Sequence, residues 1–538
     1  MLLPLLLALQ GPVTRPVDIL DYDLTVTLPD AGKTIDGTAV ITLHRLAHGG
    51  AADTLRLDLL DLTVSRVEVA GREAAFSHRD GVLRVPIVGA ADTVRVTVTY
   101  SGAPRDGLII ATDSAGRWTA FGDNWPNRAR HWFPSVDHPS DKATVTWTVV
   151  APANRKVIAN GTLVAEETVA QPDDPDGHAG APIALRRTRW REARPIPTYL
   201  MVIAAAPLVE TPLGNTACGF ADGGGCVPQA VFTMPERAGI ARVGFSEADS
   251  IVAFFARRFG PFPYEKLWHV QSASRFGGME NASAIFYADQ VFRSGGASYA
   301  LVAHETAHQW FGDAVTERGW PHLWLSEGFA TYLGALYTEH SRGPAAFRAE
   351  MDSVRRIVLG APVVASRPVI DTIETTLMNL LNRNSYEKGG FVLHMLREEI
   401  GDEAFFRGAR IYQDRHRHGT ALTDDLRAAM ELAAGRDLKP FFTQWLTRPG
   451  FPEVEATWRF DAAKGTLALT VAQAAAFGLF SFPLTVEFTD AGGRPHRSRL
   501  VIPAQRESTF TLNTGLKAAP RGFRMDPDAA LLARITAR

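Results

Sequence analysis

The chain has 538 residues, of which 46% are apolar and 21% are charged, and its formal net charge is −2. This composition is typical of a soluble globular protein, and the length predicts about three domains. The chain lacks the basic excess that nucleic-acid-binding proteins usually carry, so we expect no nucleic-acid partner.

The N-terminal stretch MLLPLLLALQG is almost wholly apolar from Leu2 to Leu9. It is too short to span a bilayer and is similar to the apolar core of a secretory signal peptide, although no Lys or Arg precedes it. We expect residues 1–16 to be a signal segment and the protein to be exported, either to the periplasm or as a secreted protein. A cytoplasmic protein with a mis-assigned start or a buried N-terminal strand is the alternative. No later stretch is long enough for a membrane span, so we expect no integral membrane segment in the mature chain.

Residues 17–206 predict strands, because apolar and polar residues alternate along them. The alternation is clearest in DYDLTVTL (21–28) and DTVRVTVTY (92–100). The stretch YLMVIAAAPLVE (199–210) is expected to be the last strand of this region. The sequence therefore predicts an N-terminal β-sheet domain over residues 17–206.

Two cysteines, Cys218 and Cys226, flank a glycine-rich stretch that is typical of a hairpin tip. In an oxidising compartment they could form a disulfide that closes a small loop, which would stabilise the fold by about 2–3 kcal/mol on the chain-entropy estimate. Two free thiols are the alternative. Both cysteines lie far in sequence from the histidines described below, and we do not expect them to bind metal.

From about residue 241 the apolar residues recur with helical spacing. The stretch ARVGFSEADSIVAFFARRFG (241–260) predicts an amphipathic helix that ends at Gly260. Helical patterns dominate from 297 to 446, and TRPGFP (447–452) interrupts them. Alternation then returns, so we place a mostly helical domain at 207–450 and a small C-terminal β-sandwich at 451–538.

The stretch VAHETAHQWFGD (302–313) places His304, Glu305 and His308 on one predicted helix. Histidines at i and i+4 lie on one helix face with Cβ atoms about 5–6 Å apart, so both can bind one Zn²⁺. Glu305 follows the first histidine and can act as general base toward a water at the metal. The alternative is three polar residues on a solvated helix face.

A catalytic zinc site needs a third protein ligand and an open position. Glu327, in WLSEGFATYL, lies far enough downstream for the first helix to end and a second helix to face it. Two histidines and a glutamate are a known catalytic zinc set. The sequence therefore predicts one Zn²⁺ per chain, held by His304, His308 and Glu327.

Together with GGMEN (277–281), these motifs resemble those of the gluzincin metallopeptidases, and in particular the zinc aminopeptidase family that includes alanyl aminopeptidase and the leukotriene hydrolases. The resemblance covers most of residues 17–452. It implies an α+β multidomain fold with an N-terminal β-sheet domain, a thermolysin-like, mostly helical catalytic domain and a small C-terminal β-sandwich. It also implies hydrolysis of the N-terminal peptide bond of peptides that have a free N-terminus.

In this family the stretch that matches GGMEN is an edge strand whose backbone pairs with the substrate. The resemblance therefore assigns substrate binding to Gly277, Gly278, Met279, Glu280 and Asn281. Among these, Glu280 is implied to bind the free α-amine through a charge-assisted hydrogen bond. The resemblance also implies that Tyr386, in NSYEKGGFVLHML, stabilises the oxyanion of the tetrahedral intermediate. A tyrosine in a helical core is the alternative for Tyr386.

Two features depart from the family pattern. The family segment that resembles residues 121–145 normally supplies a Gln or Glu that helps to bind the amine, but this position falls on Trp125. Asp123 and Asn124 are the nearest polar substitutes. Many relatives also carry a large helical C-terminal domain over the cleft, whereas the residues after Pro452 predict strands, so we expect a more open cleft.

Three other functions fit parts of the sequence. A zinc endopeptidase would use the same chemistry without an amine anchor, and GGMEN argues against it. Epoxide hydrolysis is suggested only by the resemblance to the leukotriene hydrolases. A non-catalytic scaffold with an inactive zinc site would need neither Glu305 nor Tyr386. The sequence does not predict the oligomeric state.

Overall fold

The structure, a computed structural model, describes residues 16–46, 53–89, 92–169, 184–217 and 226–537. The apolar N-terminal run and Cys218 lie outside these residues, so export and the disulfide stay predictions. Among the described helices, none is both long and apolar enough to cross a membrane. The chain divides into two compact units, Met1–Gly319 with Gln413–Ala421 and Trp320–Tyr412 with Leu422–Arg538.

The first unit begins with a large sheet whose strands bury alternate side chains. Its strands are β1 (Val17–Thr27), β2 (Ile35–Arg45), β4 (Thr63–Val69), β5 (Arg72–Glu73), β8 (Thr93–Gly102), β11 (Lys142–Pro152), β13 (Thr162–Val169) and β14 (Leu185–Pro197). Their order is β13-β14-β11-β1-β2-β8-β4-β5, with β1 and β11 parallel. Tyr22, Leu24 and Val26 of β1 are fully buried, which confirms the predicted alternation.

The first unit also contains smaller sheets. One has the order β12-β15-β10-β9 and contains β9 (Leu108–Thr112), β10 (Trp118–Gly122), β12 (Lys156–Ala159) and β15 (Ile203–Ala206). Another has the order β3-β7-β6 and contains β3 (Thr54–Asp58), β6 (Ser77–Arg79) and β7 (Val82–Pro86). The last strand expected at 199–210 is present but shorter than predicted: β15 pairs within the first of these sheets, and the chain then enters a different sheet at Val209.

That next sheet belongs to the same unit and has the order β16-β17-β18-β20-β19. Its strands are β16 (Val209–Ala217), β17 (Cys226–Thr233), β18 (Leu267–Ser272), β19 (Gly278–Met279) and β20 (Ala284–Ala288). The GGMEN stretch thus contributes an edge strand, β19, which pairs with β20. The sequence patterns did not predict this sheet within the mostly helical region.

The remaining elements of the first unit are short helices and strands. They are η2 (Ala129–His131), η3 (Thr198–Leu200), η4 (Pro235–Arg237), α1 (Ala238–Gly244), α2 (Ala248–Phe259), α3 (Asp289–Arg293), α4 (Tyr299–His308), β21 (Val315–Glu317) and β22 (Gly419–Ala421). The helix predicted at 241–260 is interrupted, because Phe245 turns inward, is 2% exposed and packs against Tyr287 with ring centroids 5.2 Å apart. Its predicted end at Gly260 is confirmed, and this residue has φ 100°.

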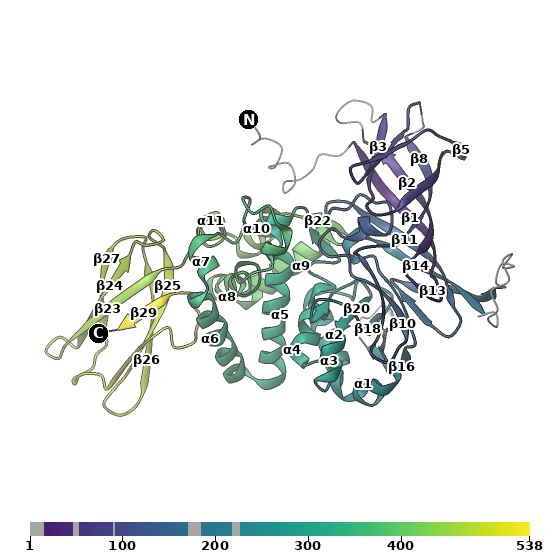
Figure 1. The fold of residues 1–538 in the computed structure, drawn as a ribbon. Coiled ribbons are helices and arrows are strands. Elements are labelled where there is room, and N and C mark those ends of the chain that lie inside the picture. The colour runs from purple at the N-terminus through teal and green to yellow at the C-terminus, as the bar shows by residue number, and fades with distance from the viewer. Residues whose placement is uncertain (1–15, 47–52, 90–91, 170–183, 218–225, 538) are drawn as a thin grey trace. The chain divides into compact units, whose positions relative to one another are not determined.

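The second unit contains most of the helices. They are η5 (Trp320–His322), α5 (Trp324–Arg342), α6 (Pro344–Gly360), α7 (Pro362–Ser366), η6 (Leu377–Leu380), η7 (Asn384–Lys388), α8 (Gly389–Ile400), α9 (Asp402–His416, which enters the first unit at Gln413), α10 (Thr423–Ala434) and α11 (Lys439–Leu446). α5 packs against α6, η7 and α8 (Figure 1).

The second unit ends in strands. The order β27-β24-β23-β29 forms one sheet and β26-β25-β28 another. These strands are β23 (Glu453–Asp461), β24 (Thr466–Ala474), β25 (Phe482–Thr489), β26 (Pro495–Ile502), β27 (Glu507–Asn513), β28 (Gly522–Met525) and β29 (Arg534–Ala537). The predicted fold class, with N-terminal sheets, a mostly helical middle region and C-terminal sheets, is confirmed.

Candidate active site

The helix α4 carries His304, Glu305 and His308. The side chain of Ser298 caps its first turn by accepting a hydrogen bond from the Leu301 N–H at 3.2 Å. Glu305 and His308 are buried, whereas His304 is partly exposed. The alternative of three polar residues on a solvated helix face therefore does not hold for Glu305 and His308.

The two histidines present their Nε2 atoms to each other at 3.2 Å. The Nδ1 atom of His308 lies 3.2 Å from the carbonyl oxygen of Phe311. Because a carbonyl oxygen can only accept, Nδ1 carries the proton and Nε2 carries the lone pair. Neighbouring imidazoles arranged in this way are suited to sharing one metal ion.

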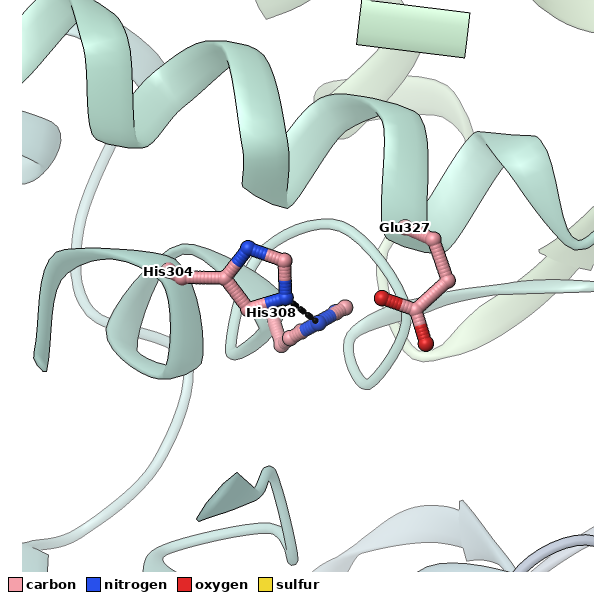
Figure 2. A group of neighbouring side chains, drawn as sticks. All are labelled: His304, His308 and Glu327. Carbon is pink, nitrogen blue, oxygen red and sulfur yellow. Dashed lines mark hydrogen bonds between the residues drawn. The ribbon is translucent and has the colours of Figure 1, made fainter. Parts of the chain in front are cut away.

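Glu327 lies in the first turn of α5 and is 5% exposed. One potential ligand atom from each of His304, His308 and Glu327 lies within 4.8 Å of the other two (Figure 2). Two imidazoles and a carboxylate are a donor set of catalytic zinc sites. The chemistry of these residues therefore fits the metal that the sequence predicts.

Glu305 lies against the GGMEN stretch. A Cβ atom added to Gly278 would overlap the carboxylate of Glu305, so only glycine allows β19 to approach this closely. Glu280, Glu305 and His308 form a second buried group whose potential ligand atoms lie within 4.8 Å of one another. The structure thus brings the predicted amine anchor, base and one metal ligand together.

We expect Gly278→Ala to lower kcat by at least about 10-fold with little change in zinc content, because the methyl group must displace Glu305 or the strand. Steady-state kinetics and metal analysis would measure both effects. Gly239→Ala is the control, since an added Cβ there meets nothing within 4 Å. An unchanged kcat for Gly278→Ala would show that the close approach has no role in turnover.

Tyr386 lies in η7, a π-helical turn that leads into α8, and is partly exposed. Such turns are frequent at functional sites. Glycines allow the segments that carry Glu327 and Tyr386 to approach each other closely. A Cβ atom added to Gly328 would lie 3.0 Å from the carbonyl carbon of Gly389. This close contact lets α5 and the start of α8 approach each other. A glycine pair in a sequence does not reveal its partner, so sequence analysis missed this contact.

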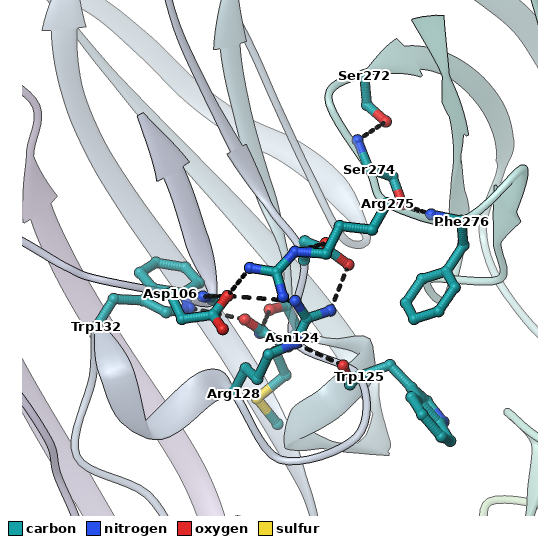
Figure 3. Close-up of polar contacts among 12 residues, drawn as sticks. Asp106, Asn124, Trp125, Arg128, Trp132, Ser272, Ser274, Arg275 and Phe276 are labelled. Atoms are coloured by element: carbon teal, nitrogen blue, oxygen red, sulfur yellow. Dashed lines mark hydrogen bonds and ion pairs between the residues drawn. The ribbon is translucent and has the colours of Figure 1, made fainter. Parts of the chain in front are cut away.

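The polar residues nearest to the missing amine contact are engaged within the protein (Figure 3). Asn124 is fully buried, and its amide nitrogen donates to the carbonyl oxygens of Met201 at 2.6 Å and Thr198 at 3.2 Å. Its Oδ1 atom accepts from Nε1 of Trp132 at 2.8 Å. These bonds use both ends of the amide and argue against a role for Asn124 in amine binding.

Asp123 is also fully buried, and its carboxylate lies 2.9 Å from Nη2 of Arg128. Asp106 pairs with the same arginine at 3.2 Å and with Arg275, which lies just before GGMEN (Figure 3). Trp125 adds an edge-to-face contact with Phe276, with ring centroids 6.0 Å apart. Residues 123–128 therefore support the start of the GGMEN stretch, and the buried Asp123 carboxylate is paired with Arg128.

Lys142 of β11 holds the loop after α4 in place through hydrogen bonds. Its Nζ atom donates to the carbonyl oxygens of Asp313 at 2.8 Å, Ala314 at 3.1 Å and Gly419 at 3.1 Å. Burial lowers the pKa of Lys142 to about 7, and the nearby Asp313 and Glu317 carboxylates oppose this shift. A strand of the N-terminal sheet therefore supports the end of the histidine helix.

Models of known protein families match two parts of the chain. The model described as the peptidase family M1 domain matches residues 244–445, and the peptidase M1 N-terminal domain matches residues 19–200. Aminopeptidases of this family are zinc-dependent, and the histidine and glutamate group above is a candidate site for that metal.

The chain is similar to several aminopeptidases. It is 30% identical over 349 residues to glutamyl aminopeptidase of Bos taurus, covering 61% of this chain and 34% of that protein. It is 30% identical over 491 residues to aminopeptidase N of Streptomyces lividans, covering 83% of this chain and 52% of that protein. The chain thus spans about half or less of the length of these relatives.

The fold is similar to that in the crystal structure of Legionella pneumophila aminopeptidase A in complex with aspartic acid. The TM-score is 0.82 at 18% sequence identity, and the match covers 97% of this chain and 60% of that chain. The N-terminal and peptidase-domain models match in succession along most of the sequence. The chain therefore belongs to peptidase family M1.

Proposed function

We propose that the protein is a zinc aminopeptidase that hydrolyses the N-terminal peptide bond of peptides. The observation that carries the proposal is the buried group of Glu280, Glu305 and His308, whose potential ligand atoms lie within 4.8 Å of one another. In the proposed roles of these residues, a carboxylate suited to an ammonium group would lie beside the general base and a metal ligand. The similarity to aminopeptidases of family M1 supports the same reaction.

In this proposal His304, His308 and Glu327 hold one Zn²⁺ per chain. Zinc bound there would lower the pKa of a water molecule and polarise the scissile carbonyl group. Glu305 takes the proton of the attacking water and delivers it to the leaving amine. The Glu305 carboxylate lies close to Gly278, and the residue is 5% exposed, so the carboxylate is largely shielded from bulk water.

The remaining roles concern the substrate. The outer edge of β19 is not paired with another strand in the described sheet, so its backbone can bind an extended peptide. Tyr386 donates a hydrogen bond to the developing oxyanion. Glu280, which is 6% exposed, binds the α-ammonium group through a bond typically worth about 1.5–3 kcal/mol.

A panel of aminoacyl chromogenic substrates, each with and without an N-acetyl group, tests the proposal. We expect acetylation to lower kcat/KM by at least about 10-fold, because it removes the charge and adds bulk where the chain should end. Glu280→Gln keeps an acceptor oxygen and loses the charge, whereas Glu280→Ala loses both. With free-amine substrates, kcat/KM should therefore fall in that order.

Equal hydrolysis of blocked and free substrates by the wild type would reject the amine anchor and favour an endopeptidase. The same panel, varied at the first residue, would identify the preferred side chain at that position.

A further inference from the structure

A fully buried glutamine follows the histidine helix and contacts the segment that carries the amine anchor. The Nε2 atom of Gln309 donates to the carbonyl oxygen of Glu280 at 2.9 Å and to Oδ2 of Asp313 at 2.8 Å. Its Oε1 atom accepts from the Ser283 N–H at 2.9 Å. Both amide hydrogens and the carbonyl oxygen of Gln309 are thus engaged, which leaves the side chain one position.

These bonds hold the segment from Glu280 to Ser283 at both ends. Ser283 has φ 65°, which non-glycine residues rarely adopt, so its conformation depends on its contacts. Its Oγ atom accepts from the Gly161 N–H at 2.8 Å, and its carbonyl oxygen accepts from the Trp268 N–H at 3.1 Å. The segment is therefore fixed to the sheet at Ser283, and Gln309 fixes it to the end of α4.

Hydrogen bonds also hold the second acceptor of the Gln309 amide in place. Asp313, its second acceptor, is fully buried, and its backbone N–H donates to the carbonyl oxygen of His308 at 3.0 Å. The carbonyl oxygen of Asp313 accepts from Nζ of Lys142 at 2.8 Å. One side-chain amide thus connects the turn that follows His308 to the backbone of Glu280.

We propose that Gln309 is a positioning residue, whose side-chain amide sets the place of Glu280 relative to α4 and thereby the preference for a free N-terminus. The inference rests on the proposed aminopeptidase function. A small displacement of Glu280 moves the first peptide bond away from Glu305, and misplacement of this kind is costly to turnover. Gln309 acts through the backbone of Glu280, so its loss should affect the two classes of substrate differently.

The test uses Gln309→Met, which keeps the length of the side chain and removes all three hydrogen bonds. We expect the ratio of kcat/KM for free over N-acetylated substrates to fall by at least about 10-fold relative to wild type. Zinc content should not change. A general loss of folded protein would lower both activities together and would leave the ratio as it is.

Gln413→Met is the matched control. Gln413 is also fully buried, and its Nε2 atom donates to the carbonyl oxygen of Trp310 at 2.8 Å. It therefore contacts the same turn after α4, and its described hydrogen bond does not involve Glu280. This variant should keep the wild-type ratio, because it removes a buried hydrogen bond at the same place without releasing the anchor.

A double-mutant cycle with Glu280→Ala gives a second criterion. If Gln309 acts through Glu280, adding Gln309→Met to Glu280→Ala should cause little further fall in the ratio. Should Gln309→Met fail to fold, Gln309→Asn replaces it, because an amide one methylene shorter cannot hold Glu280 and Ser283 together.

An unchanged ratio of kcat/KM for free over N-acetylated substrates in a folded Gln309 variant would overturn the inference. So would a double variant in which the effects of Gln309→Met and Glu280→Ala on this ratio multiply. A wild-type enzyme that cuts blocked and free substrates equally would instead reject the proposed function, so the two failures are distinguishable.

Discussion

Glu305→Gln is expected to lower kcat by at least about 10²-fold while the protein keeps its zinc, because it removes the proton acceptor and leaves the ligand set intact. Glu305 is 5% exposed and lies against Gly278, and an amide of nearly equal size fits the same space. The loss should therefore appear in turnover rather than in folding. Steady-state kinetics with metal analysis on the same sample would measure it.

Glu192→Gln provides the matched control for this substitution. Glu192 is a fully buried glutamate of the same unit, and burial together with the neighbouring Glu265 raises the pKa of its carboxyl group. Because burial favours the neutral form of this carboxyl group, a neutral amide of nearly equal size should replace it with little effect on activity. Near-normal turnover of zinc-loaded Glu305→Gln would mean that another group takes the proton.

Removal of zinc is expected to abolish activity, and added Zn²⁺ should restore it. Glu327→Ala should lower zinc affinity by at least about 10²-fold, since loss even of a residue that only orients a ligand costs about 10–100-fold. Titration against a chelator of known affinity would measure the change. Two histidines alone make an incomplete site, so activity should fall in parallel.

Glu339→Ala controls for the loss of a carboxylate on the same helix. Glu339 lies near the other end of α5, where its Oε2 atom accepts from Nη1 of Arg397 at 2.7 Å. Its removal should cost little stability, as for most ion pairs near the surface, and should leave zinc affinity unchanged. Full zinc occupancy in Glu327→Ala would remove Glu327 from the ligand set.

The sequence by itself determined the features that depend on local periodicity. Alternation along β1 and β8, helical spacing in α4, α5 and α8, and the interruption at 447–452 are all visible within short windows, because side-chain direction repeats every 2 or 3.6 residues. The spacing of His304 and His308 belongs to this class, since a helix alone places them on one face. The family motifs added Glu280 and Tyr386, which no local pattern would identify.

Only the tertiary structure decided the contacts between distant parts of the chain. The sequence does not show three of these contacts, because the identity of a glycine or a buried amide does not indicate which distant residue it meets. They are the contacts of Gly278 with Glu305, Gly328 with Gly389 and Gln309 with Glu280. Apart from the edge strand that the family resemblance implied at GGMEN, the sheet that contains β19 was missed for the same reason: its short strands gain their stability from neighbours rather than from their own pattern. Local residues thus specify which groups can react, and long-range packing decides where each of them lies.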